Sequence, residues 1–489
     1  MARQFNNYLT GIRDRMTGQQ SILFLINSAL FIAGILLLIG PAIQNGFPIL
    51  HADSGTYLLE GFGTKIPVSR PLSYCLFVRF TSRIFSIWSV VVTQAIIAYW
   101  TIWLAVNTLA GKKKIAWLPF ITVALLSVTT GISFYVSQIM TDIFMPVALL
   151  GLFILVVRER MPWYTWLFLG LIVWLSLIVH MSNLPVLTGL AFAIIILKII
   201  LEKSIKPVKQ LSVYIIAGIL VISWLTNPLI STIYGEGFRT SNSGNIVFFS
   251  RLLQAGAAQK YIKDRCEKEP EYYLCEYKDQ IDTYDRLDKF LWPDTSFLYD
   301  HPCREKTWDY CWRVRNQEFG EINSAILDHP PSRNIYLKAV WDDFQLALHA
   351  FGLTGYVSFR EGSHIDYPLK RYYKNDYKSF KNSRQYAGTM VFRDMNRIIH
   401  VVVWISLALA AFLIIRNRRI LDRRSPYLIL MSILVLTWLG NALLTAFVAV
   451  VSERFLGRFI WLLPFFVIML VYREYSALYA DSADKAREE

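Results

Sequence analysis

Charged residues are scarce in this 489-residue chain: Asp, Glu, Lys and Arg make up only 18% of it, whereas roughly a quarter is usual in soluble domains. Hydrophobic residues make up 54%, and the mean hydropathy is +0.38. This composition excludes a disordered chain, a coiled coil and a soluble enzyme of ordinary composition. The apolar residues fall in runs of about 20, the length that a helix needs to cross a bilayer. The sequence therefore predicts a polytopic membrane protein.

The chain also lacks the short motifs of several enzyme classes. It contains no Walker loop, no GxSxG or HExxH motif and no dinucleotide fingerprint. No internal repeat is evident, which disfavours a transporter built from repeated halves. The net charge of +14 would suggest nucleic-acid binding in a soluble protein. Because the basic residues gather at the ends of apolar runs, they are better interpreted as topology signals, and no nucleic-acid partner is expected.

The apolar runs define the expected fold class, an all-α polytopic membrane protein with about ten transmembrane helices. The runs lie near residues 21–44, 87–110, 116–134, 140–157, 163–180, 184–201, 211–233, 398–415, 426–450 and 456–472. No small-residue cleavage site follows the first run, so we expect a retained helix rather than a signal peptide.

Three domains follow from this division. Residues 1–233 form an N-terminal transmembrane module of seven spans, with a loop at 45–86 on the outer side. Residues 234–397 are too polar for lipid, and we expect them to form an inserted, mainly helical extracytoplasmic domain. Residues 398–489 form a C-terminal transmembrane module of three spans with a cytoplasmic tail.

Basic residues occupy alternate connections, as the positive-inside rule requires. They are Arg3, Arg13 and Arg15, then Lys112–Lys114, Arg158 and Arg160, Lys203, Lys206 and Lys209, Arg416 to Arg424, and Arg473. This pattern places both termini in the cytoplasm and the large polar segment outside. We expect an integral protein of a bacterial inner membrane, with residues 234–397 in the periplasm.

Cysteine is rare, and its distribution agrees with this topology. Four of the five cysteines lie in the large polar segment, at Cys266, Cys275, Cys303 and Cys311. In an oxidising compartment they predict two disulfides, for which pairing of nearest neighbours is the simplest of three connectivities. A zinc site is the alternative, but the spacings are not of the CxxC kind and His301 is the only nearby histidine. We expect Cys75, which lies alone in an apolar stretch, to be a free thiol.

Two acidic residues lie at the expected outer ends of spans. Asp53 follows the first span and precedes Ser54-Gly55-Thr56, while Asp142 follows Thr141 and is the only acid between Glu60 and Glu159. Each could simply cap a helix. Ionisable residues at a membrane are, however, expensive and commonly functional. Because both fall at the same depth, we expect them to act together, with Asp53 as the base and Asp142 as its support.

Arginines lie at the same predicted depth. Arg454 and Arg458 are four residues apart, so on a helix they share one face. Their guanidinium groups suit phosphate oxygens. The alternatives are snorkelling to lipid headgroups, or pairing with Glu453 and the two aspartates. Arg70 opens an amphipathic stretch expected at the interface, and His180, at the end of a span, is more often a packed histidine than a base.

The motif His51-Ala-Asp53-Ser54-Gly-Thr-Tyr57, followed by Arg70-Pro71-Leu72-Ser73-Tyr74, resembles the GT-C superfamily of integral-membrane glycosyltransferases. Thr141-Asp142 is similar to the second acid that members carry near spans three and four. Glu453-Arg454-Phe455-Leu456, before Leu463-Pro464, resembles a late motif of the superfamily. The large domain departs from the pattern, because many members carry theirs after the last span.

The resemblance implies a GT-C-like fold and transfer of a sugar from a polyprenyl-phosphate donor at the outer face of the membrane. It implies an essential acid at Asp53 and a second acid at Asp142. From their position and spacing we expect Arg454 and Arg458, with Arg70, to bind the donor phosphate, and we expect His51, Tyr57 and His180 to be accessory residues. The acid can deprotonate an acceptor hydroxyl while the arginines stabilise the departing phosphate.

Partners and alternative functions stay open at this point. The acceptor can be a glycan, a lipid or a protein, and membrane lipids surround the spans. No cofactor is required by the sequence, although some superfamily members use a divalent metal. One alternative is a polysaccharide polymerase or ligase. A second is a secondary transporter in which Asp53 and Asp142 carry protons or bind substrate, and a third is an assembly partner whose outer domain does the work.

Overall fold

The computed structural model describes residues 18–488, except 64, 112–116, 301–302, 304–305, 391 and 424. Several residues singled out above lie outside the described part, namely Arg3, Arg13, Arg15, Lys112–Lys114, His301 and Arg424. The described residues are largely helical, and the extended pairing among them is a single bridge between Ile49 and Gln138. The all-α prediction is therefore confirmed for this part of the chain.

Ten apolar helices or helix segments coincide with the ten predicted runs. Among the described residues, six helical stretches are long and apolar enough to cross a membrane. They are α6 (Trp88–Ala110), α11 (Asn183–Glu202), α12 (Leu211–Ile233), α21 (Arg393–Arg416), α22 (Pro426–Val448), and the stretch Glu453–Leu478 that joins α23 (Glu453–Ile460) to α24 (Leu462–Glu488). Shorter apolar segments lie in α2 (Gly18–Leu38), α7 (Leu118–Thr129), α9 (Phe144–Val157) and α10 (Trp163–Ile178). By length and composition, the chain is a helical membrane protein.

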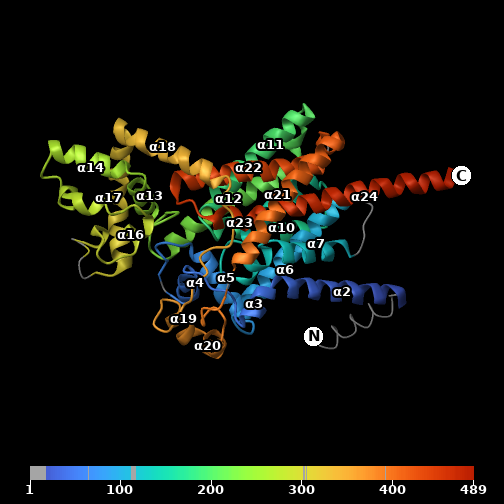
Figure 1. Cartoon of the computed structure of the whole chain (residues 1–489), viewed down its shortest axis with the longest axis horizontal. Helices are drawn as coiled ribbons and strands as arrows, with labels where there is room; N and C mark the ends of the chain where they lie inside the picture. The colour runs from blue at the N-terminus through green and yellow to red at the C-terminus, as the bar shows by residue number, and fades with distance from the viewer. Residues whose placement is uncertain are drawn as a thin grey trace.

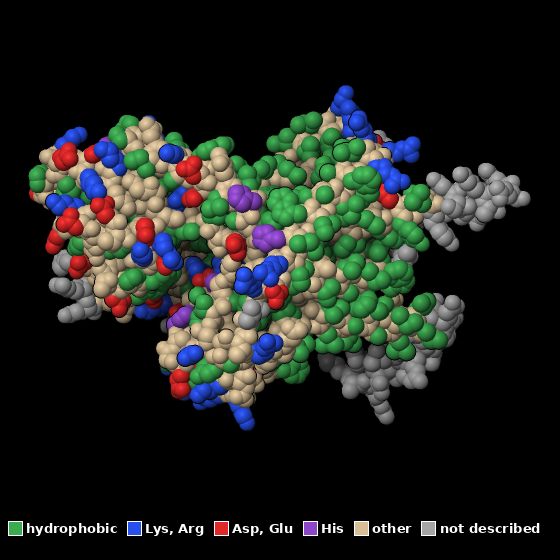
Figure 2. Space-filling model, in the orientation of Figure 1, with side chains coloured by type: hydrophobic (Ala, Val, Ile, Leu, Met, Phe, Trp, Pro, Cys, Tyr) green, Lys and Arg blue, Asp and Glu red, His purple; other side chains and the backbone are tan. Residues whose placement is uncertain are grey.

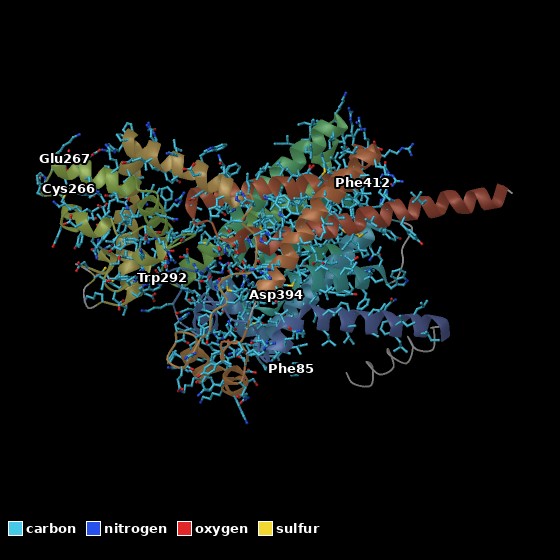
Figure 3. All side chains as sticks on the ribbon, in the orientation of Figure 1. Phe85, Cys266, Glu267, Trp292, Asp394 and Phe412 are labelled. Atoms are coloured by element: carbon cyan, nitrogen blue, oxygen red, sulfur yellow. A yellow bond between two sulfur atoms is a disulfide. The ribbon has the colours of Figure 1, made fainter. Side chains whose placement is uncertain are left out.

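The surface of these helices supports the same conclusion. Large apolar side chains are exposed along one half of the molecule, where Figure 2 shows a nearly continuous hydrophobic surface, while most charged side chains lie on the other half. Phe412 of α21, labelled in Figure 3, is 57% exposed. Apolar patches of this extent in a monomer mark contact with lipid or another protein. α9 lies at the centre of the bundle, where every residue from Phe144 to Val156 is buried.

The 3₁₀ turns η1 (Lys206–Lys209) and η4 (Arg418–Leu421) join α11 to α12 and α21 to α22. A group of short α-helices lies at one end of the bundle. They are α3 (Gly40–Asn45), α4 (Ser54–Glu60), α5 (Leu72–Ser82) and α8 (Ile132–Ser137), together with α23. α3 ends at Gly46, whose φ of 79° lies in the left-handed region that glycine adopts readily. α2 begins and α24 ends at the opposite end of the bundle (Figure 1).

Residues 244–347 form a helical unit with a hydrophobic core of its own, here called the polar domain, which packs against α22. Its helices include α13 (Gly244–Gln254), α14 (Ala257–Lys268), α15 (Lys278–Ile281), α16 (Leu287–Leu291), α17 (Trp308–Asp328) and α18 (Pro330–Ala347), with 3₁₀ turns η2 (Tyr273–Tyr277) and η3 (Phe297–Tyr299). Its core is aromatic, and the rings of Phe249 and Phe319 are 4.4 Å apart. Figure 1 shows this domain at the end of the molecule far from the C-terminus.

The predicted single domain at 234–397 divides in two. Residues after the polar domain, including α19 (Asp366–Tyr372) and α20 (Lys374–Lys381), pack on the loop at 45–86 and join the core of the membrane module. The ring of Tyr372 stacks on that of Phe62, with 4.3 Å between their centroids. The Gln385 side chain accepts a hydrogen bond from the Leu50 N–H and donates one to the Leu50 carbonyl. The domain boundary therefore differs from the prediction, because the aromatic residues of this segment bury themselves against the loop.

The cysteine prediction is confirmed in part. Cys266, labelled in Figure 3, is disulfide-bonded to Cys275, and Cys75 is a buried free thiol. The prediction of a second disulfide is wrong for this structure, because Cys303 and Cys311 are buried free thiols. Cys311 lies in the first turn of α17, where its Sγ donates to the backbone carbonyl of Cys303 at 3.6 Å, so the two residues adjoin without a bond.

Candidate functional site

Asp53 lies at the start of α4 but does not cap it. Its backbone is already helical and its carboxylate makes no capping hydrogen bond. Instead, Oδ1 accepts a hydrogen bond from Nη2 of Arg70 at 2.6 Å. Arg70 is anchored in turn by donation from Nη1 to the Ser69 carbonyl at 2.8 Å. The capping alternative is therefore wrong for Asp53, whose carboxylate is committed to an ion pair.

Asp142 is also free of a capping role. α9 begins two residues later, at Phe144, and its N-terminus has no side-chain cap. The Asp142 side chain is completely buried; Oδ2 accepts a weak hydrogen bond from Gln138 at 3.4 Å, and Oδ1 has no hydrogen-bond partner. A buried charge requires charged partners, and α23 supplies them.

α23 directs its two arginines inward, onto the aspartates. Nη1 of Arg454 lies 3.8 Å from Oδ2 of Asp53, and its Nε lies 3.8 Å from Oδ2 of Asp142. Nη1 of Arg458 lies 4.0 Å from Oδ1 of Asp142. Arg458 is only 1% exposed. Its guanidinium group therefore does not reach lipid headgroups, and the snorkelling alternative is wrong for this residue. Of the alternatives weighed from the sequence, pairing with the two aspartates is the one observed.

Two histidines complete the cluster in their neutral form. The imidazole of His51 lies against Arg454, whose Nη1 is 3.1 Å and 3.2 Å from the two ring nitrogens. Burial, reinforced by the charge of Arg454, lowers the pKa of His51 to about 4. Burial and the charge of Arg458 likewise hold the pKa of His180 well below its ordinary value. Nδ1 of His180 is 2.8 Å from Oγ of Ser182.

The cluster also sets the charge states around Asp53. Burial by itself would raise the pKa of the Asp53 carboxyl, but the charges of Arg70 and Arg454 outweigh it and hold that pKa far below its usual range. Tyr57 is buried beside them, and its ring packs edge-on against Tyr74 with 4.7 Å between centroids. Burial, followed by the charge of Asp53, raises the pKa of Tyr57, so its phenol stays protonated.

The resulting balance of charge is unequal. Three guanidinium groups, of Arg70, Arg454 and Arg458, face two carboxylates, while the histidines are neutral. Nε and Nη1 of Arg458 are buried and make no hydrogen bond. An excess of buried positive charge with unused donors is an arrangement that binds an anion.

Two contributing residues, Asn441 and Tyr135, were not found from the sequence. Oδ1 of Asn441 accepts from Nη2 of Arg458 at 3.2 Å, and Ser182 Oγ lies 3.5 Å from the same nitrogen. The Tyr135 hydroxyl donates to the Gly352 carbonyl at 3.0 Å and thereby supports the turn beside α23. Asn441 had a usable signal, since an amide inside the apolar run of α22 is unusual.

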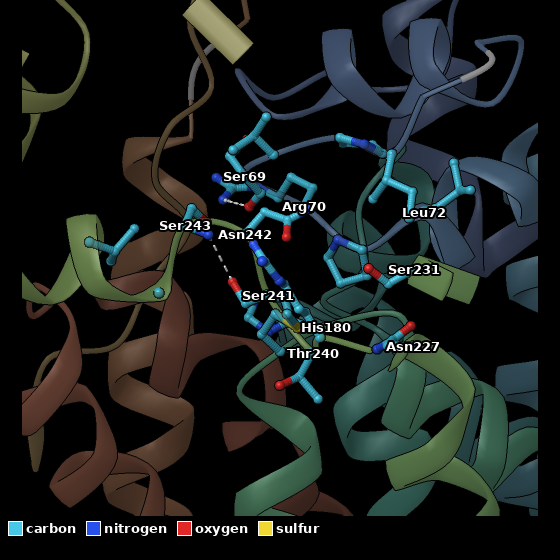
Figure 4. A pocket seen from close by; sticks show the side chains of 18 of the residues that line it. Ser69, Arg70, Leu72, His180, Asn227, Ser231, Thr240, Ser241, Asn242 and Ser243 are labelled. Carbon is cyan, nitrogen blue, oxygen red and sulfur yellow. Dashed lines mark hydrogen bonds between the residues drawn. The ribbon is translucent and has the colours of Figure 1, made fainter. Parts of the chain in front are cut away.

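A cavity of about 400 Å³ adjoins this cluster (Figure 4). Arg70 and His180 line it, whereas Arg454 and Arg458 do not. Among the described residues, no three His, Cys, Asp or Glu side chains converge to hold a metal ion. Both aspartates form ion pairs with arginines instead. Whether a divalent metal takes part stays a prediction.

No protein-family model matches the chain, and neither a curated protein nor a solved structure matches it.

Proposed function

We propose that this protein is a membrane glycosyltransferase of the GT-C type that moves a sugar from a polyprenyl-phosphate donor to an acceptor hydroxyl. The observation that carries the proposal is the buried cluster in which three arginines face two aspartates, with donors of Arg458 unused. Its surplus positive charge fits the phosphate of such a donor. All ten apolar helices then cross the membrane, both termini are cytoplasmic, and the cluster lies at the periplasmic face of a bacterial inner membrane.

The proposed reaction uses the cluster in two ways. Asp53 takes the proton of the acceptor hydroxyl, whose oxygen bonds to the anomeric carbon as the bond from that carbon to the phosphate oxygen breaks. Arg454 and Arg458 stabilise the charge that collects on the departing phosphate. Asp142, fully buried, holds the two guanidiniums in position.

The low pKa of Asp53 fits this scheme only if the donor changes its surroundings. In the structure, Arg70 and Arg454 keep the carboxylate ionised and therefore weakly basic. A donor phosphate that draws these guanidiniums to itself leaves Asp53 in a buried site with less compensation, and burial then raises its pKa. Donor binding would thus activate the base.

The membrane half of the protein offers a place for the lipid chain of the donor. An apolar cavity of about 590 Å³ lies between α11 and α12, with Phe192 and Ala217 among its lining residues. Near its end closest to the cluster, Trp224 Nε1 donates to Thr188 Oγ1 at 3.2 Å. An isoprenoid chain is apolar throughout, which suits this lining.

The proposal is tested by the substitution Asp53→Asn. It preserves the shape of the side chain but removes the basic oxygen, and we expect the rate of donor consumption to fall by at least ~10²-fold. Turnover of labelled polyprenyl-phosphate sugars is measured in membrane vesicles that carry the overproduced protein and its native acceptor. Glu60→Gln, at the far end of the same α4 helix, is the matched control and should keep the wild-type rate. A wild-type rate in Asp53→Asn would refute the assignment and make Asp142 the leading candidate.

A further inference from the structure

The cavity beside Arg70 has features that the proposed transfer step does not use. It opens between the stretch 66–72, the end of α12 and the segment Arg239–Gly244 that leads into α13. Figure 4 shows Arg70, Thr240, Ser241, Asn242 and Ser243 gathered around it. Its volume of about 400 Å³ lies within the range of small-molecule sites.

The charge of the cavity lining is positive. Arg70 and Arg239 both line it, and none of the described lining residues is Asp or Glu. α13, 11 residues long, begins at Gly244 with its N-terminus at the cavity, which adds partial positive charge. One first-turn N–H, that of Asn245, already donates to Oδ1 of Asn316 at 3.0 Å, so it is not available to a ligand.

Asn242 adds an independent sign of a missing ligand. The residue is only 6% exposed, it lines the cavity, and its Oδ1 has no hydrogen-bond partner. A buried carbonyl oxygen without a donor is unfavourable and uncommon in folded proteins. A ligand hydroxyl placed in the cavity would satisfy it, while Arg239 and Arg70 would bind an anionic group of the same ligand.

We infer that this cavity binds a phosphate-bearing sugar or polyol, and that this ligand is the acceptor of the transferase. The second half of the inference rests on the proposed function, whereas the anion site does not. The apolar wall that includes Val247 and Phe248 suits the C–H faces of such a ligand. Arg70, which lines the cavity and also bonds Asp53, places the acceptor next to the proposed base.

Binding is measured by titration calorimetry on the full-length protein in detergent, at constant ionic strength. The probes are glycerol 3-phosphate, inorganic phosphate and glycerol. We expect both phosphates to bind, glycerol 3-phosphate more tightly, and glycerol not to bind. Arg239→Gln should weaken glycerol 3-phosphate by about tenfold to a hundredfold, the loss of one charge-assisted contact. Asn242→Ala should weaken glycerol 3-phosphate while leaving inorganic phosphate unchanged.

Arg333→Gln is the matched control, because Arg333 is exposed on α18 of the polar domain and does not line the cavity. Equal weakening in Arg333→Gln, or no binding of either phosphate by the wild-type protein, overturns the site. If Arg239→Gln weakens the polyprenyl-phosphate donor as much as glycerol 3-phosphate, the cavity holds the donor and the acceptor assignment is overturned. Arg239-dependent binding together with an absence of sugar transfer would retain the anion site and refute the proposed function.

Discussion

Neutral His51 predicts a specific loss of stability in acid. Its pKa is lowered from 6.5 to about 4 by burial, with Arg454 adding to the effect. The unfolded chain therefore takes up a proton between pH 6.5 and pH 4 that the folded protein does not. Stability from this residue is complete above pH 6.5 and falls as the pH drops toward 4. The shift corresponds to at most about 3 kcal/mol.

The assay is thermal unfolding of the purified protein in detergent, followed from pH 8 to pH 4. We expect the melting temperature of His51→Gln to decrease less between pH 8 and pH 4 than that of the wild type, because glutamine is not protonated in this range. The glutamine carbonyl can still accept a hydrogen bond from Arg454. The pKa of His180 is lowered as well, so the His51→Gln variant should retain part of the pH dependence. The informative quantity is the difference between the two curves.

His349→Gln is the matched control, since His349 is exposed on the surface of the protein. It should follow the wild-type curve throughout. Parallel curves for wild type and His51→Gln would refute the reasoning, because they would mean that His51 is protonated as easily in the folded protein as in the unfolded chain.

Three further predictions concern the donor and the thiols. Arg458→Ala should weaken binding of a polyprenyl-phosphate donor by roughly tenfold to a hundredfold, as expected for a charge-assisted contact of ~1.5–3 kcal/mol; unchanged affinity in the folded variant would contradict a role in phosphate binding. Ala217→Trp should fill the apolar cavity between α11 and α12 and weaken the same donor, while Ala411→Trp, at an exposed position on α21, should not. Alkylation of the denatured protein without reductant should label three cysteines by intact mass, and labelling of one alone would mean that Cys303 and Cys311 are bonded after all.

The apolar helices were predictable because a run of about 20 apolar residues has few alternatives to a buried or lipid-facing helix. The ten predicted runs accordingly match helices in the structure. The short helix after Asp53 was also expected, but its supposed cap was not observed. Propensity rules describe what a side chain can do locally, and they do not include an arginine 17 residues away that competes for the same carboxylate.

Contacts between distant segments explain most of what the sequence did not reveal. The residues after the polar domain look hydrophilic, yet Tyr372, Tyr373 and Phe380 bury against the loop at 45–86. Cys303 and Cys311 lie next to each other without a bond, and the Cys311 thiol donates instead to the Cys303 carbonyl. Spacing alone does not determine whether two neighbouring cysteines form a bond.

The different burial of the two aspartates suggests how the site divides its work. The Asp142 side chain is completely buried and faces Arg454 and Arg458, so loss of its carboxylate by substitution would leave buried cations without compensation. The side chain of Asp53 is 17% exposed and is bonded to an arginine that lines the cavity. In the proposed reaction the base must pass its proton to solvent after each turnover, and Asp53 is the more accessible of the two acids. This difference in exposure favours Asp53 as the base in the proposed reaction, and Asp142 as the residue that holds the two arginines.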